Sequence, residues 1–315
     1  MSPKIGYLLP TREAVMEGRP EATPLLALAE KAEDLGYDSV WIGDSLLARP
    51  RHEPITLLAA VAGRTKKVQL GTAVLLPAFR NPVVLAHQIA TLDQASDGRV
   101  ILGVGIAGDM ANIRSEFEAA GVPFEKRVGR MLEGLRLCRA LWSGEPVDWD
   151  GRWKVKKGVL GPTPVQKNGP PIWGGGSVTA ALKRAAKNYE GWFPTGPADP
   201  AIWGEQWRET MGYVKEAGRD VDAFTGAVYL TLALDDDAEK ANAKLNKFLK
   251  TITCNRQNIS ANAKLATVVR RKVPPNGLRG MSTKVPAISC SGSRATTTGT
   301  WTPSPKSAHR SGGSQ

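Results

Sequence analysis

Three consecutive glycines are the most chemically suggestive feature of this sequence. Gly174, Gly175 and Gly176 close an apolar, strand-like run, and Ser177 precedes apolar residues at helical spacing over 178–189. Glycines let backbone N–H groups approach a phosphate closely, and a helix N-terminus adds a field that favours anions. Ser177 is a natural N-cap. The pattern predicts a phosphate-binding turn, with a plain tight turn and helix cap as the alternative.

A second group of small residues stands where two further apolar runs end. Aliphatic and β-branched residues fill 68–77 and 100–105, and apolar residues recur at helical spacing over 81–93 between them. This strand–helix–strand pattern suits a parallel sheet covered on both faces. Barrels and open α/β sheets bind ligands at the C-terminal ends of their strands. The candidate binding residues at these ends are Thr72, Ala73, Val74 and Gly105.

Two charged residues complete the candidate set. Asp44 ends the apolar run 39–44, where a carboxylate could orient a substrate or shuttle a proton, although a capping or hydrogen-bonding role at the strand end is an equal alternative. Arg127 lies at helical spacing with Arg130 and Glu133, for which a salt-bridged solvent face is the default interpretation. No metal-ligand spacing is present among the histidines and cysteines, and Cys138 fits a buried apolar helix face.

The elements that would position these residues alternate along the chain. Strand and helix patterns succeed each other seven times, with a surface hairpin expected within 148–164 and the last strand at 223–234. Seven steps favour a β/α barrel over an open doubly wound sheet. The fold class expected is therefore an α/β (β/α)8 TIM barrel whose last step is lost or disordered.

Charge divides the chain at about residue 250. The formal net charge is +12, yet residues 1–250 hold 32 Lys and Arg against 30 Asp and Glu, whereas residues 251–315 hold ten basic and no acidic residues. We expect a barrel domain over 1–250 and a basic, low-complexity tail over 251–315. No run of 18 apolar residues and no leader are present, so the sequence predicts a cytoplasmic protein without a membrane span.

Several motifs in order carry a family resemblance. GYDSVWIGDS, GTAVLLPAFRNPVVLAHQIATLDQASDGRVILGVG, PFEKRVGRMLEGLRLCRALWSGEPV and PPIWGGGS together resemble the bacterial-luciferase-like flavin-dependent oxidoreductases over residues 4–250. The resemblance implies a luciferase-like TIM barrel that binds FMN or the deazaflavin coenzyme F420 at its C-terminal mouth. It also implies monooxygenation with reduced flavin and oxygen, or hydride transfer with the deazaflavin, on a small organic substrate, and a possible homodimer.

The resemblance also assigns roles to the candidate residues. It implies a bulge or non-prolyl cis peptide near Ala73 beneath the flavin ring, a phosphate at the glycine turn, and Asp44 facing the ring. It implies that Arg127 helps to hold the phosphate or a dimer contact. Many deazaflavin-dependent relatives carry a histidine where this chain has Ser45, and that departure weakens a proposal of histidine acid catalysis.

Two other classes stay open: a non-catalytic flavin-binding barrel and a nucleic-acid binder acting through the basic tail. The tail itself has a further interpretation. Reading G280MSTKVPAISCSGSRATTTGTWTPSPKSAHR310 from the third base of each codon permits YVDEGASHLVLRFAGDHDRHLDTIAEVR. That string has the hydrophobic strand and terminal helix that an eighth β/α step requires, so we interpret the tail as a frameshift product.

Restoring the reading frame at about codon 251 tests this interpretation. We expect an eighth strand to close the barrel and to raise soluble yield and cofactor affinity. In the parent, trypsin should cleave the tail and leave a fragment ending near Lys250. A tail that binds an acidic partner predicts instead salt-sensitive retention on heparin and loss of function on frame restoration.

Overall fold

The computed structural model describes residues 3–195, 199–253 and 266–269. Contacts divide the chain into two compact units. The larger unit comprises residues 4–195 and 204–227, and the described part of the smaller one comprises residue 3 and the residues 199–203, 228–253 and 266–269. Each unit contains its own β-sheet.

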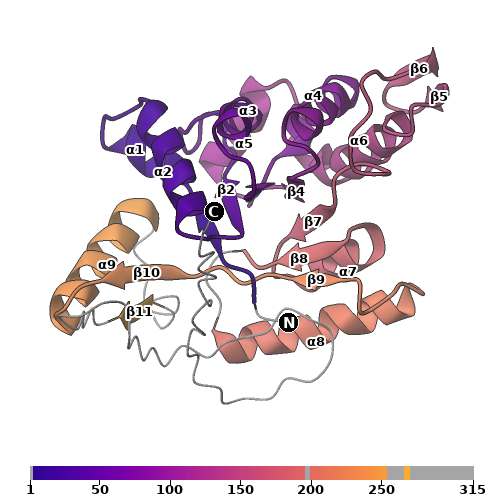
Figure 1. The fold of residues 1–315 in the computed structure, drawn as a ribbon. Helices are drawn as coiled ribbons and strands as arrows, with labels where there is room; N and C mark the ends of the chain where they lie inside the picture. Colours follow the sequence, from indigo (N-terminus) through magenta and orange to yellow (C-terminus); the bar gives the residue numbers. More distant parts are fainter. Residues whose placement is uncertain (1–2, 196–198, 254–265, 270–315) are drawn as a thin grey trace, which may run out of the picture. The chain divides into compact units, whose positions relative to one another are not determined.

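The larger unit is built on a curled, seven-stranded sheet in which every neighbouring pair is parallel (Figure 1). Its strands, in spatial order, are β1 (Gly6–Leu8), β2 (Ser39–Ile42), β3 (Gln69–Thr72), β4 (Val100–Val104), β7 (Ile172–Gly175), β8 (Gly191–Phe193) and β9 (Thr225–Gly226). Within the described residues β1 and β9 are the two edges of this sheet. The predicted β/α barrel architecture is confirmed for this part of the chain, and most residues of its expected last step lie outside the described part.

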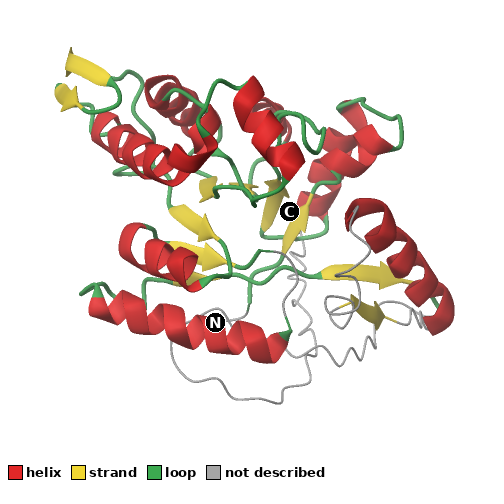
Figure 2. Ribbon diagram, turned by 180° about the vertical axis from the view of Figure 1, so that it is seen from behind, coloured by secondary structure: helices red, strands yellow, loops and turns green. Residues whose placement is uncertain are grey.

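Helices alternate with these strands and lie outside them (Figure 2). The helices that follow the strands are α2 (Thr23–Asp34), α3 (Pro54–Arg64), α4 (Pro82–Ala95), α6 (Arg127–Leu141), α7 (Thr179–Asn188) and α8 (Pro200–Glu216). Short helical segments also occupy the loops after β1, β3 and β4: α1 (Thr11–Met16), η1 (Pro77–Phe79), α5 (Ala111–Ala119) and η2 (Phe124–Lys126). The sequence patterns do not predict these four segments.

Helix α4 shows why the predicted helices form where they do. Asn81 caps it, with its Oδ1 accepting from the backbone N–H of Val83 at 2.9 Å, and Pro82 occupies the first turn. Cys138 of α6 lies against this helix, with its Sγ 3.2 Å from the carbonyl oxygen of Pro82. Burial raises the pKa of the Cys138 thiol to about 12, so the predicted role as a small buried hydrophobe is confirmed.

Three aromatic side chains of the sheet contact one another. The ring centroids of Trp41 and Trp173 lie 5.5 Å apart, and each lies 5.9 Å from that of Phe193. Neighbouring strands carry glycine opposite these rings. A Cβ on Gly71 would collide with the Trp41 ring, and one on Gly191 would lie 2.7 Å from Trp173 Cδ1. Small and large residues therefore fit together across the sheet.

The predicted hairpin is confirmed, whereas the predicted last strand is not a single element. β5 (Val147–Asp150) and β6 (Lys154–Gly158) form an antiparallel pair. The run 223–234 is divided into β9, which pairs with β8, and β10 (Thr231–Leu234), which pairs in parallel with β11 (Ala266–Val269) in the smaller unit. Helix α9 (Ala238–Thr253) buries Ala241 and Leu245 in that unit.

The expected division at residue 250 stays a prediction, although the larger compact unit ends at Ala227. Most of the expected tail, 254–265 and 270–315, lies outside the described residues.

Two glycine-to-alanine variants test the packing of Trp41. We expect Gly71→Ala to lower the free energy of unfolding by about 1–3 kcal/mol, because the new methyl group must displace the Trp41 ring. Gly63→Ala on α3 is the matched control. Apart from its chain neighbours and the backbone of its own helix, no atom of the described residues lies within 4 Å of the added Cβ, so the change should be neutral or stabilise the helix by about 0.5–1 kcal/mol. Urea unfolding measures both; equal shifts would contradict the packing described.

Candidate functional site

The segment after β3 crosses toward β4 at the C-terminal end of the sheet. The N–H of Ala73 donates to the carbonyl oxygen of Ile42 at 2.8 Å, and the N–H of Leu75 donates to that of Gly103 at 2.7 Å. The Thr72 hydroxyl donates to the same Gly103 oxygen at 2.7 Å. The peptide bond between Ala73 and Val74 is cis, so the predicted bulge or cis peptide at this position is confirmed.

Three strand ends converge on the side chain of Val74. A Cβ added to Gly105, after β4, would lie 2.6 Å from its Cγ2, and a Cβ added to Gly175, on β7, would lie 3.0 Å from its Cγ1. Only glycine at these two positions leaves room for the Val74 side chain. The structure thus brings together the predicted residues Thr72, Ala73, Val74, Gly105 and Gly175.

The glycine turn is ordered by the neighbouring strand β8. Gly176 has a φ of +139°, which requires glycine, and its N–H donates to the carbonyl oxygen of Phe193 at 3.1 Å. Its own carbonyl oxygen accepts from Trp192 Nε1 at 2.6 Å. A Cβ on Gly174 would lie 2.9 Å from the Cβ of Ala185. The turn is therefore held tightly against both β8 and α7.

Ser177 is not the N-cap that the sequence predicts. Helix α7 begins at Thr179, and its N-cap is Val178, whose side chain makes no capping bond. The Ser177 hydroxyl accepts instead from the N–H of Thr195 at 2.8 Å, a competing donor from the loop after β8. The first turn of α7 is exposed and has no side-chain cap, so the N–H groups of Thr179 and Ala180 have no intrahelical partner.

Arg127 lies beside this region with its guanidinium group partly engaged. Its Nε donates to the carbonyl oxygen of Ile106 at 3.1 Å, next to Gly105, and its carbon Cζ lies 3.6 Å from the Phe124 ring centroid. Arg184 of α7 is a second, half-buried cation that the sequence reasoning missed. Burial lowers the pKa of Arg184, and the positive charge of Arg127 contributes to that lowering. The only feature of the sequence that could have pointed to Arg184 is its position in the second turn of the helix that follows the glycines.

Asp44 takes part in an ion-pair network. Its Oδ2 accepts from the N–H of Leu76 at 2.9 Å and from Arg80 Nη1 at 2.6 Å, and its side chain is 5% exposed. Arg80 also pairs with Glu53 at 2.9 Å. Burial alone would lower the pKa of Arg80, but the negative charges of Asp44 and Glu53 outweigh burial and raise this pKa. The structure shows the hydrogen-bonding role for Asp44; a direct role in catalysis stays a prediction.

The loop after β2 is held by a buried carboxylate. Glu116 of α5 is 1% exposed, and its oxygens accept from the N–H groups of Leu46 and Ala48, each at 2.7 Å. The Ser45 hydroxyl donates to the same carboxylate at 3.1 Å. Sequence reasoning missed Glu116 because its partners are about 70 residues away. The Ser45 hydroxyl is therefore already committed to a hydrogen bond within the protein.

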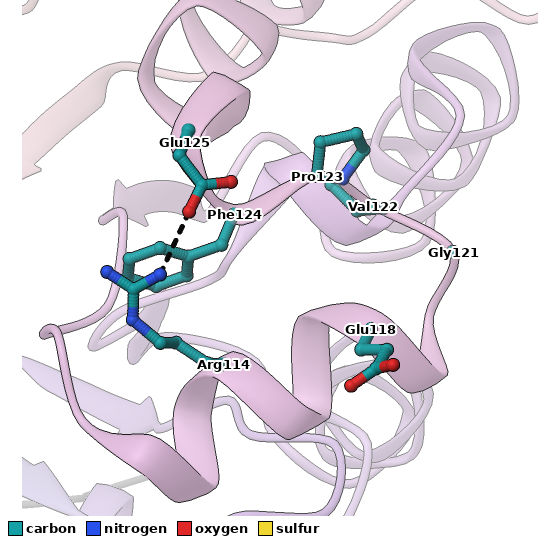
Figure 3. Close-up of a pocket in the computed structure, with 7 residues that line it drawn as sticks. All are labelled: Arg114, Glu118, Gly121, Val122, Pro123, Phe124 and Glu125. Carbon is teal, nitrogen blue, oxygen red and sulfur yellow. Dashed lines mark hydrogen bonds and ion pairs between the residues drawn. The ribbon is translucent and has the colours of Figure 1, made fainter.

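An open pocket of about 370 Å³ lies beside η2, near Arg127. Figure 3 shows Arg114 alongside the Phe124 ring and paired with Glu125 at 2.9 Å. None of the predicted site residues lines this pocket, whose wall is Arg114, Glu118, Gly121, Val122, Pro123, Phe124 and Glu125. In the part of the chain that the structure describes, no group of three metal-ligating side chains occurs, and none of the helices has the length and apolarity to cross a membrane.

Comparisons with known proteins agree with this architecture. The profile of the luciferase-like monooxygenase family matches residues 3–286. An F420-dependent glucose-6-phosphate dehydrogenase of Nocardia farcinica is 32% identical over 224 residues, which cover 69% of this chain and 66% of the relative. The chain thus matches just under two thirds of that relative's length.

Two solved structures share the fold. Monooxygenase RslO1 from Streptomyces bottropensis superimposes with a TM-score of 0.69 at 25% identity, covering 84% of this chain and 83% of that one. An F420-dependent secondary alcohol dehydrogenase in complex with an F420–acetone adduct gives 0.68 at 23% identity, covering 85% and 83%. The shared fold and the profile match together define a luciferase-like β/α-barrel protein. The chain belongs to the luciferase-like monooxygenase family.

Replacing Glu116 tests how the loop after β2 is held. In the parent protein, the N–H groups of Leu46 and Ala48 donate to the two carboxylate oxygens of Glu116. In Glu116→Gln only one oxygen can accept, because an NH2 group replaces the other. We expect a loss of about 1–3 kcal/mol in unfolding free energy and faster hydrogen exchange at the Leu46 and Ala48 amides. The exposed Glu118→Gln on the same helix is the control. Equal exchange in both variants would refute the bond assignment.

Proposed function

We propose that this chain is an oxidoreductase that uses the deazaflavin F420 or FMN to oxidise or reduce a small organic substrate. The observation that carries the proposal is the cis Ala73–Val74 peptide at the C-terminal end of the sheet, where Gly105 and Gly175 carry no side chain and pack directly against Val74. A flat ring system needs a surface of small residues. The family membership and the F420-dependent relatives support this choice of cofactor.

The residues present fit the phosphate end of such a cofactor. The exposed first turn of α7 offers backbone N–H groups without a side-chain cap, and the glycine turn lets an anion approach them. Arg184, in the second turn of the same helix, forms no hydrogen bond through its guanidinium group within the described residues. Arg127 adds a second positive charge nearby. We assign the phosphate to this turn, and the ring to the surface formed by Thr72, Ala73, Val74 and Gly105.

When bound, the cofactor would supply hydride transfer or oxygen activation. The chain's own residues position the reactants: the Asp44–Arg80 pair fixes the loops after β2 and β3, and Glu116 fixes Ser45 to Ala48. Because Ser45 stands where many deazaflavin-dependent relatives have histidine, a histidine at that place is not available to move a proton. The glucose-6-phosphate named for the relatives is therefore not part of the function proposed for this chain.

A non-catalytic, cofactor-binding barrel is the second candidate, and the same departure at Ser45 favours it. Fluorescence-quenching titrations with F420 and with FMN test cofactor binding, and turnover with the reduced cofactors separates the two candidates. A homodimer stays a proposal that gel filtration tests. The basic-tail nucleic-acid binder concerns residues outside the described part of the chain.

A charge placed in the glycine turn tests the phosphate assignment. We expect Gly175→Asp to weaken cofactor binding at least about tenfold, because its side chain would crowd Val74 and bring a negative charge to the glycine turn that is assigned the phosphate. Gly175→Ala separates steric from electrostatic effects, since its Cβ lies 3.0 Å from Val74 Cγ1. Gly63→Asp, exposed on α3, is the charge-matched control. Parent-like affinity of the Gly175→Asp variant for both cofactors would place the phosphate elsewhere.

A further inference from the structure

Arg51 is a largely desolvated arginine at the C-terminal end of β2, and it forms no ion pair within the described residues. A Cβ on Gly43 would collide with Nη1 of Arg51 and would lie 3.4 Å from the carbonyl oxygen of Ala73. The guanidinium group therefore lies beside the Ala73–Val74 peptide. In the described part of the chain, its hydrogen bonding is confined to Nε, which donates to the carbonyl oxygen of Arg49 at 3.2 Å. An arginine has five N–H donors, so four are left over.

Arg12 is a second, nearby arginine with an unused donor. It lies on α1, directly after β1, and the N–H of Leu9 donates to the carbonyl oxygen of Trp41 at 2.9 Å, so this segment lies against β2. The Arg12 side chain is 12% exposed, and its Nε is buried without a hydrogen-bond partner among the described residues. Burial lowers the pKa of Arg51, and the positive charges of Arg12 and Arg49 lower it further, whereas the charges of Glu13 and Asp44, each more weakly felt than that of Arg12, oppose this lowering in part.

The carboxylates around this loop are occupied by other groups. They are Glu13, Asp44, Glu53 and Glu116. Arg80 takes both Asp44 and Glu53, Glu116 receives backbone and hydroxyl donors, and Glu13 lies 3.3 Å from Nη2 of Arg12. Among the described residues none pairs with Arg51. A buried cation without a partner is costly, and an anionic ligand would offset that cost.

The loop that carries Arg51 is held in place at both ends. Glu116 binds its first half, and His52 Nε2 lies 2.8 Å from the carbonyl oxygen of Pro20. The same loop exposes Leu46 and Leu47, at 51% and 60%. Arg51 therefore stands on a positioned loop that also offers an apolar surface.

We propose that Arg51 and Arg12 bind an oxyanion of the substrate, a carboxylate or phosphate group, beside the Ala73–Val74 peptide. The substrate class is a small organic anion whose apolar body lies against Leu46 and Leu47. Guanidinium groups bind such oxyanions through paired, charge-assisted hydrogen bonds. This inference rests on the proposed function, because it places the substrate next to the assigned cofactor surface.

Calorimetric titration of the full-length protein tests the inference with three probes of one shape: benzoate, phenyl phosphate and neutral benzamide. We expect the parent to bind at least one anion ten times more tightly than benzamide. Arg51→Gln and Arg12→Gln should each remove that preference, Arg51→Lys should keep part of it, and Arg64→Gln should leave it unchanged. Arg64 lies at the far end of α3 and pairs with Glu30. Circular dichroism checks that each variant is folded.

The site is overturned if the parent shows no preference for an anion, or if folded Arg51→Gln and Arg12→Gln both keep it. Repeating the titration with saturating F420 or FMN identifies the source of the oxyanion. Continued anion binding supports the substrate; loss of anion binding, with weaker cofactor binding by Arg51→Gln, assigns the arginines to the cofactor and overturns the inference. A protein that binds no cofactor defeats the proposed function alone, since the anion titration still gives its own answer.

Discussion

The site depends on how the chain leaves β3. Between Thr72 and Leu75 the backbone is held from both sides, by the carbonyl oxygen of Ile42 on β2 and by that of Gly103 on β4. These bonds direct the Val74 side chain into the space between β4 and β7. Positions 105 and 175 must therefore be glycine, because no larger residue fits beside Val74. The flat surface assigned to the cofactor ring is a product of this one constraint.

Most carboxylates around this surface already have partners, and within the described residues a few arginines have no carboxylate partner. Arg80 neutralises both Asp44 and Glu53, and Glu116 is satisfied by N–H and hydroxyl donors. Arg51 and Arg184 keep unpaired guanidinium groups within the described residues. The first lies beside the Ala73–Val74 peptide, and the second lies on α7, the helix that follows the glycine turn. Two anions of different origin, one on the cofactor and one on the substrate, would complete this arrangement.

Much of the architecture follows from local sequence patterns, because apolar periodicity and capping residues act over a few positions. Asn81 before Pro82 predicts the start of α4, and the hairpin over 148–164 appears where its turn residues indicate. The glycine turn and the segment 72–74 were also predictable. Ser177 was assigned wrongly because Thr195, 18 residues away, competes for its hydroxyl. Arg184, Arg51 and Glu116 act through long-range contacts that no local pattern reveals.

The central claim is that a flavin or deazaflavin lies on the surface around Val74, with its phosphate at the first turn of α7. Amide hydrogen exchange with and without saturating F420 or FMN measures this most directly, because the first N–H groups of a helix have no intrahelical partner and exchange quickly when free. The account predicts that the cofactor slows exchange at Val178, Thr179 and Ala180 and leaves the hairpin β5–β6 unchanged. Cofactor binding without protection of these amides would contradict it.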